Sequence, residues 1–266
     1  MSTPTFLANK NTHERDSHIL FEEGPHIYTI DGNSNFMSVT KWNHSHFPYF
    51  NAPKIIRRMM SSKKWPESQY FGMTSKEIQT KWRTNGREAA TAGTKMHYDI
   101  ECFYNNESVE NNSTEFTYFQ SFHEQIGSKL IPYRTEWMIY DKKLKMAGSI
   151  DMIYQDPEDG ALIIYDWKRC KEIKKINNFE SAKTECISHL PNSNFWHYSL
   201  QLNTYKAIIE KNYGKKVKGM FLVCLHPNNK NKSWLRFEVP DLQEDINSLF
   251  SLRLKKLYGK EYKQYL

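Results

Sequence analysis

Cysteine is scarce in this chain and follows no metal-binding or redox pattern. The 266 residues hold four cysteines and no C-x-x-C pair: Cys102, Cys170, Cys186 and Cys224. In a chain of this length such spacing favours ordinary reduced thiols over a disulfide framework or a zinc site. An iron–sulfur cluster held by the four scattered cysteines stays open as an alternative.

Long apolar runs are missing too. No stretch approaches the ~20 apolar residues that cross a bilayer. Residues 1–16 have neither the apolar core of a secretory signal nor the Arg-rich, acid-poor make-up of a transit peptide. We therefore expect an intracellular protein, in the cytoplasm or the nucleus, with no membrane partner. Low-complexity segments are absent as well, and the length suffices for a substantial core.

Acidic residues are fewer than basic ones. The chain has 37 Lys and Arg against 30 Asp and Glu, a formal charge of +7 and a pI of about 9.0. This balance favours a polyanionic partner. Many basic proteins have no such partner, so charge alone does not identify one.

Two β-branched and aromatic runs, residues 148–154 and 162–168, form the centre of the pattern. Pro157 and Gly160 mark a turn between them, so we expect a hairpin. Alternation along the second strand places Asp166 and Lys168 on the same face as Leu162 and Ile164. With Asp151 from the first strand, these groups can hold a divalent cation beside a phosphate. The alternative is a buried Asp–Lys ion pair with no catalytic role.

The preceding segments are predicted to be helical. Residues 75–91 form one helix, Gly93-Thr94 breaks it, and a second helix begins at Thr94. His97 and Glu101 lie four residues apart on this second helix and share a face. A lone helical histidine is usually structural, but this helix can pack on the sheet and direct His97 toward the two aspartates.

The N-terminal part suggests a hairpin and a basic helix. Residues 18–30 and 36–39 are expected to pair around the turn Asp31-Gly32, and Ser38 or Thr40 to cap a short helix. Residues 53–64 suit a helix that exposes Arg57 and Arg58. Such a helix is either a solvated surface or a track for a phosphate backbone.

The rest of the chain supplies two more helices and further strands. Helix 114–129 is expected to pack in the core, and strand 132–141 carries an isolated Glu136 among apolar residues. The three consecutive antiparallel strands thus carry Glu136, Asp151, Asp166 and Lys168. Helix 195–213 follows, with Gln201 and Tyr205 four apart. Strands 218–225 and 233–239 precede a terminal helix with a capping box at Asp241 to Glu244.

This order of features resembles the PD-(D/E)XK nucleases, in particular their RecB-like exonuclease branch. That branch includes lambda-type phage exonucleases, mitochondrial genome-maintenance exonucleases and relatives in large DNA viruses. The matching residues are Gly93 to His97 with Ile100-Glu101, then Glu136, Gly148 to Asp151, Asp166 to Lys168, and Gln201 to Tyr205. His26 to Tyr28 with Ser38 to Thr40 resembles the N-terminal lead-in of the viral and mitochondrial members. Asp166 stands where many members have Glu.

The resemblance implies a site that binds one or two Mg²⁺ or Mn²⁺ ions. His97, Asp151, Asp166 and the Trp167 carbonyl would be the metal ligands, and Lys168 would orient or activate the attacking water. Glu136 and Glu101 would lie near the metals; we group Glu136 with the catalytic residues Asp151, Asp166 and Lys168. We group Glu101 with the DNA-contacting residues Gln201, Tyr205, Arg57 and Arg58.

The resemblance also implies an α/β fold, with a mixed central sheet flanked by helices. We expect an N-terminal subdomain over residues 1–74 and a nuclease core over residues 75–266. The function implied is DNA exonuclease activity in viral or organellar recombination, repair or replication, with an infected host cell as one setting. A recombination or single-strand-binding protein is a further candidate partner. An endonuclease of the same fold and a catalytically silent nucleic-acid-binding module are the alternatives.

Overall fold

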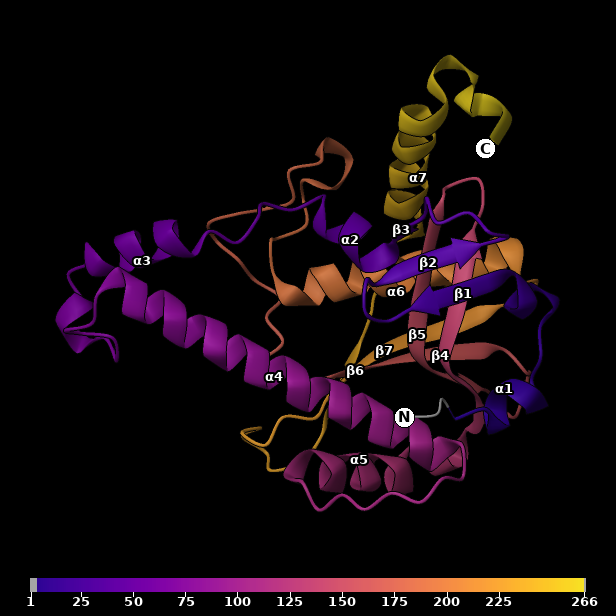
Figure 1. Cartoon of the computed structure of the whole chain (residues 1–266), viewed down its shortest axis with the longest axis horizontal. Helices are drawn as coiled ribbons and strands as arrows, with labels where there is room; N and C mark the ends of the chain where they lie inside the picture. Colours follow the sequence, from indigo (N-terminus) through magenta and orange to yellow (C-terminus); the bar gives the residue numbers. More distant parts are fainter. Residues whose placement is uncertain (1–3, 266) are drawn as a thin grey trace.

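The computed structural model describes residues 4–265 and has a six-stranded mixed sheet at its centre (Figure 1). Strands run in the order β3-β5-β6-β7-β8. β3 and β6 pair with opposite ends of one edge of β5, and β4 pairs along its other edge. Their bounds are β3 (Met37–Ser38), β4 (Ile131–Asp141), β5 (Met146–Gln155), β6 (Leu162–Lys168), β7 (Val217–Cys224) and β8 (Leu235–Glu238). The expected antiparallel series β4, β5, β6 is confirmed.

Helices cover both faces of this sheet. α4 (Ser75–Tyr104) and α5 (Thr114–Gln125) pack on one face, and α2 (Val39–His44), α6 (Asn194–Asn212) and α7 (Gln243–Tyr258) contribute to the core on the other. The expected mixed α/β fold is therefore confirmed. In residues 4–265 no helix is both long enough and apolar enough to cross a membrane.

The side chains of β6 alternate between the two cores as predicted. Ile163, Tyr165 and Trp167 pack with α4 and α5. Leu162 and Ile164 belong to the core that contains α6. Asp166 and Lys168 continue the second series at the end of the strand.

Helix α4 differs from our prediction because Gly93 does not interrupt it. The helix runs unbroken from Ser75 to Tyr104, and Thr74 and Glu77 form a capping box at its start. A glycine inside a helix costs about 1 kcal/mol relative to alanine, which capping and packing can offset. His97 is therefore fixed on the same helix that extends away from the sheet in Figure 1.

The extended end of α4 is part of an arm, which we define as residues 49–95. It includes α3 (Ala52–Met60), the turn Trp65–Glu67 and the first two thirds of α4. Figure 1 shows α3 packed on the distant end of α4. The predicted helix 53–64 is confirmed in its position but ends earlier, at Met60.

The N-terminal hairpin also differs from our prediction. β1 (Ile19–Glu22) pairs with β2 (Ile27–Ile30) around Gly24-Pro25. The predicted turn at Asp31-Gly32 also forms, but it is followed by a single antiparallel bridge between Ile30 and Asn33, and residues 36–39 do not pair with β2. Both dipeptides favour turns, and only the first joins two strands of several residues. β3 instead pairs in parallel with β5, and Ser38 caps α2 by accepting from the Lys41 amide. The domain boundary at residue 74 stays a prediction.

The end of α5 and the start of α7 also differ from the prediction. α5 ends at Gln125 and a short 3-10 turn, Gly127–Lys129, follows it. The predicted capping box of the last helix does not form, because Leu242 occupies the cap position. Asp241 accepts a hydrogen bond from the Gln243 amide instead. A short helix, α1 (Phe6–Lys10), and a 3-10 turn, Gly259–Tyr265, lie near the two ends.

Candidate metal centre

The site forms where β5 separates from β6. The two strands pair only from Met152 to Gln155 of β5, and β3 pairs with its beginning at Met146 and Ala147. Residues 148–151 lie between these two ladders. Asp151 bridges the opening, since its carboxylate accepts a hydrogen bond of 2.9 Å from the Trp167 amide.

His97 reaches this opening from α4. Its Nε2 lies 2.9 Å from the Trp167 carbonyl oxygen, which can only accept, so Nε2 carries a proton. Its Nδ1 lies 3.5 Å from Asp151 and 3.8 Å from Glu136. Burial lowers the pKa of His97, but the two carboxylates outweigh burial and raise that pKa to about 9.

This arrangement calls for a positive charge. A neutral His97 would direct the lone pair of Nδ1 at two carboxylates, which is repulsive. Either a proton on Nδ1 or a cation between the three groups removes that repulsion.

Glu136 lies across from Asp151 on β4. It has φ of +42°, a left-handed conformation that is uncommon for glutamate and marks a strained position. Ser149 on β5 donates a hydrogen bond of 2.8 Å to its Oε2. The backbone conformation and this bond hold the carboxylate toward His97, so the acidic side chain is built into the site.

His97, Glu136 and Asp151 fit a hard divalent cation. One ligand atom from each lies within 4.8 Å of the others, and in residues 4–265 this is the one group of three or more such residues. Carboxylate oxygens suit Mg²⁺ and Mn²⁺, and imidazole is compatible with Mn²⁺. The cysteines are free thiols and form no such group in the part of the chain described.

Asp166 and Lys168 form a buried ion pair on the α6 side. Lys168 Nζ lies 2.5 Å from Asp166 Oδ2, and the Asp166 side chain is 3% exposed. Burial raises the pKa of Asp166. For Lys168, burial lowers the pKa, but Asp166 and then Asp151 outweigh it and raise the pKa overall. The lysine is therefore charged in this geometry, which favours an orienting role over proton abstraction.

Helix α6 adds Gln201 and Tyr205 beside the strand opening. Gln201 donates a hydrogen bond of 3.1 Å to the Tyr205 hydroxyl. Tyr205 is only 2% exposed and packs against Gly148 of β5. Because its ring is buried, Tyr205 can support Gln201 but offers little surface for direct contact with DNA. Tyr198 lies one turn before Gln201, and the centre of its ring is 4.6 Å from Lys168 Nζ.

The remaining predicted residues lie further from the three ligand atoms. Glu101 is on α4, one turn after His97, and is 8% exposed. Burial, and then Glu136, raise the pKa of Glu101 to about 7. Such a buried carboxylate is poorly placed to contact a phosphate. Arg57 and Arg58 are exposed on α3, in the arm.

Sequence reasoning missed one neighbour of the site, Tyr28 on β2. It is buried, and its hydroxyl lies near the main chain of Ser149. Burial, and then Glu136, raise the pKa of Tyr28, so it stays a neutral phenol. The motif His26 to Tyr28 was the available signal, but only the tertiary structure places Tyr28 beside Ser149.

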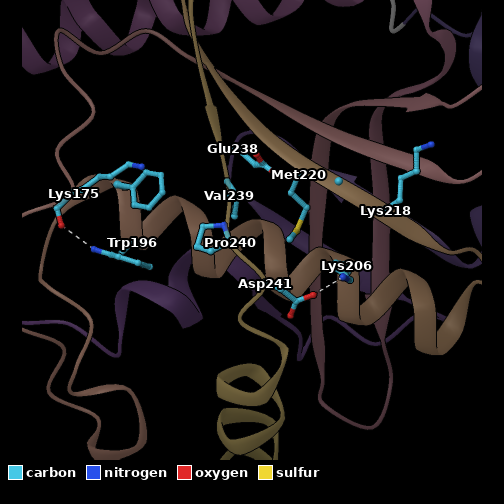
Figure 2. A pocket seen from close by; sticks show the side chains of 11 residues that line it. Lys175, Trp196, Lys206, Lys218, Met220, Glu238, Val239, Pro240 and Asp241 are labelled. Atoms are coloured by element: carbon cyan, nitrogen blue, oxygen red, sulfur yellow. Dashed lines mark hydrogen bonds and ion pairs between the residues drawn. The ribbon is translucent and has the colours of Figure 1, made fainter.

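A cavity of about 620 Å³ lies elsewhere on the protein (Figure 2). It is lined by Lys175 and by residues of α6, β7 and the segment 238–241. Its polar groups are largely paired, as Figure 2 shows for Lys206 with Asp241 and for Trp196 with the Lys175 carbonyl. None of the predicted site residues is among the eleven that line it.

Two solved structures share features with this chain at low identity. The crystal structure of SSO0001 is 14% identical, with a TM-score of 0.36, over 98% of this chain and 88% of that chain. An alkaline exonuclease from Laribacter hongkongensis is 13% identical, with a TM-score of 0.32, over 84% of this chain and 94% of that chain.

No curated protein matches the sequence. A family model of the PD-(D/E)XK nuclease superfamily does match, over residues 64–263. This range contains the strand opening, His97, the three antiparallel strands and α6. The chain belongs to the PD-(D/E)XK nuclease superfamily.

Proposed function

We propose that this nuclease is a metal-dependent DNA exonuclease that hydrolyses phosphodiester bonds from DNA ends. The observation that carries the proposal is the group His97, Glu136 and Asp151, whose facing atoms can hold a cation and lie near the Asp166–Lys168 pair. A catalytically silent binding module would not require all five side chains.

His97, Glu136 and Asp151 are the residues that would hold Mg²⁺ or Mn²⁺, and Asp166 and the Trp167 carbonyl are further candidate ligands. When bound, such an ion makes water nucleophilic at neutral pH and stabilises charge on phosphate. The chain's own contribution is positional. The Trp167 amide and Ser149 fix Asp151 and Glu136, and the Lys168 ammonium can donate to a phosphate oxygen or to the attacking water.

The arm supplies a surface for the nucleic acid. Residues 49–95 hold ten Lys and Arg against three Glu, a charge of +7, which equals the formal charge of the whole chain. The residues outside the arm therefore have a net charge of zero. Arg57 and Arg58 belong to this arm, and Gln201 lies nearer the site. We propose that the strand runs from the arm to the metal centre, and that DNA recombination, repair or replication is served.

The test compares linear DNA with covalently closed circles of the same sequence. In Mg²⁺ or Mn²⁺ we expect linear DNA to be degraded to short products while circles persist. EDTA should stop the degradation of linear DNA. Labelling the 5′ and 3′ ends separately then gives the polarity. Equal cleavage of circular and linear DNA would favour the endonuclease alternative, and no cleavage with either metal would remove the enzymatic proposal.

A further inference from the structure

Exposed aromatic side chains are concentrated on the arm. The exposed aromatics in residues 4–265 are Phe6, Tyr49, Phe50, Phe71 and Phe179. Tyr49, Phe50 and Phe71 belong to the arm, at 76%, 74% and 59% exposure. Phe179 contacts the arm from the segment 169–193. Four of five exposed rings therefore gather in one region, which we call the ring cluster (Tyr49, Phe50, Phe71 and Phe179).

Cations accompany these rings. The Arg58 guanidinium lies 4.6 Å from the centre of Phe179, and Lys183 Nζ lies 4.6 Å from the centre of Tyr49. The Lys183 amide also donates to the carbonyl of His46, three residues before the arm, and so holds the segment 169–193 beside the start of the arm. Phe50 packs near Trp82 of α4, with ring centres 6.0 Å apart. Rings and positive charges thus lie next to one another along the arm and the segment 169–193.

We propose that the ring cluster binds unpaired DNA, so that the preferred substrate of this nuclease has a single-stranded end. The inference rests on the function proposed above and specifies its substrate. Bases inside a duplex are stacked on one another, so only the terminal base pair offers a free face to a protein ring. In a single strand each base has a free face, and aromatic rings with neighbouring cations stack on it while Lys and Arg follow the phosphates.

The chemistry disfavours other occupants of this surface. The arm has ten Lys and Arg and only three Glu, so a protein partner would need many carboxylates to complement it. A polyanion such as a nucleic acid complements this charge directly. An anionic membrane surface would also match charge and rings. The nuclease fold and the metal group favour nucleic acid over lipid, and the experiment below separates the two.

The distance from arm to site sets the length of strand needed. Trp82 and His97 are fifteen residues apart on one helix, which corresponds to about 22 Å along its axis. At about 3.4 Å per nucleotide this is about six nucleotides, and fewer when the strand is extended. Oligonucleotides shorter than about four nucleotides should therefore fail to reach both the ring cluster and the metal centre.

The test is fluorescence anisotropy in EDTA, so that binding is measured without cleavage. The probes are a labelled oligothymidylate of about 20 nucleotides and a blunt duplex of equal length. We expect tighter binding of the single strand. Phe50→Ala and Phe71→Ala should each weaken its binding about 5-fold or more, since a base–ring stack contributes ~1 kcal/mol or more. Phe6→Ala, which removes an exposed ring outside the arm, is the matched control and should not change it.

A second pair of variants distinguishes stacking from simple apolar contact. Phe50→Trp should retain single-strand binding, and Phe50→Leu should weaken it about as much as Phe50→Ala does. Equal affinity for single strand and duplex, or full binding by Phe50→Leu, would overturn the inference. The inference would also be overturned if Phe50→Ala weakened binding to anionic vesicles but left oligothymidylate binding unchanged. Because EDTA removes catalysis, these outcomes are independent of whether the chain cleaves DNA.

Discussion

His97 on α4 donates a hydrogen bond of 2.9 Å to the main-chain carbonyl oxygen of Trp167 on β6. The bond joins residues 70 positions apart and fixes which nitrogen of His97 carries the proton. As a result Nδ1 is directed at Asp151 and Glu136. The Trp167 amide also donates a hydrogen bond to the Asp151 carboxylate. The backbone of Trp167 therefore positions two of the three candidate ligands, His97 and Asp151.

Asp151→Asn and Asp166→Asn should each abolish metal-dependent cleavage while the fold is retained. Each change keeps the shape of the side chain but removes a negative charge that a cation requires. We expect losses beyond the roughly 10- to 100-fold typical of groups that only support a metal ligand. Initial rates over a Mn²⁺ titration, with circular dichroism as the folding control, measure this. Recovery of full activity at saturating metal would argue against the assignment.

Asp166→Ala should also lower the free energy of unfolding, by about 3 kcal/mol, because Lys168 would lose the partner of its buried charge. Lys168→Met combined with Asp166→Ala should recover part of that loss, since no unpaired charge remains. Urea denaturation of the two variants measures both effects. If Asp166→Ala is as stable as the natural protein, the 2.5 Å pair does not hold in solution.

Lys168→Arg should be nearly as inactive as Lys168→Ala. A planar guanidinium cannot take the place of a compact ammonium between Asp166 and the Tyr198 ring. DNA binding in EDTA should survive in both variants. Near-native turnover by Lys168→Arg would mean that the lysine acts only as a positive charge near phosphate.

Gly148→Ala should destabilise the protein by about 1–3 kcal/mol. A Cβ at this position would lie 2.8 Å from Cε1 of Tyr205, whose buried ring has little room to move. Gly86→Ala is the matched control, because a Cβ there meets open space and a helix favours alanine by about 1 kcal/mol. Urea midpoints should therefore shift in opposite directions for the two variants.

Arg57→Ala with Arg58→Ala should reduce the salt dependence of DNA binding. Losing two phosphate contacts should flatten the slope of log K against log salt by about 1.4 for a single strand. Lys255→Ala with Lys256→Ala removes the same charge from exposed positions on α7 and serves as control. An unchanged slope in the arginine variant would place the DNA path away from α3.

The sequence alone determined the strand core and most of its candidate chemistry. The runs 148–154 and 162–168 are β-branched and aromatic and are separated by a turn with Pro157 and Gly160. Their hairpin depends on this local pattern, and the shared face of Asp166 and Lys168 follows from the alternation of side chains along any strand. The spacing of His97 and Glu101 likewise required only a helix. The length of α4 was not determined in this way, because packing and capping outweighed the local cost of Gly93.

Only the tertiary structure decided which groups meet. Glu136 joined His97 and Asp151 because its left-handed backbone and the Ser149 hydroxyl turn its carboxylate into the strand opening. Asp166 instead lies against Lys168, and Tyr205 is buried on Gly148 with Gln201 beside it. These outcomes depend on contacts between segments distant along the chain, which local periodicity does not contain. The ring cluster depends in the same way on the segment 169–193 packing against the arm.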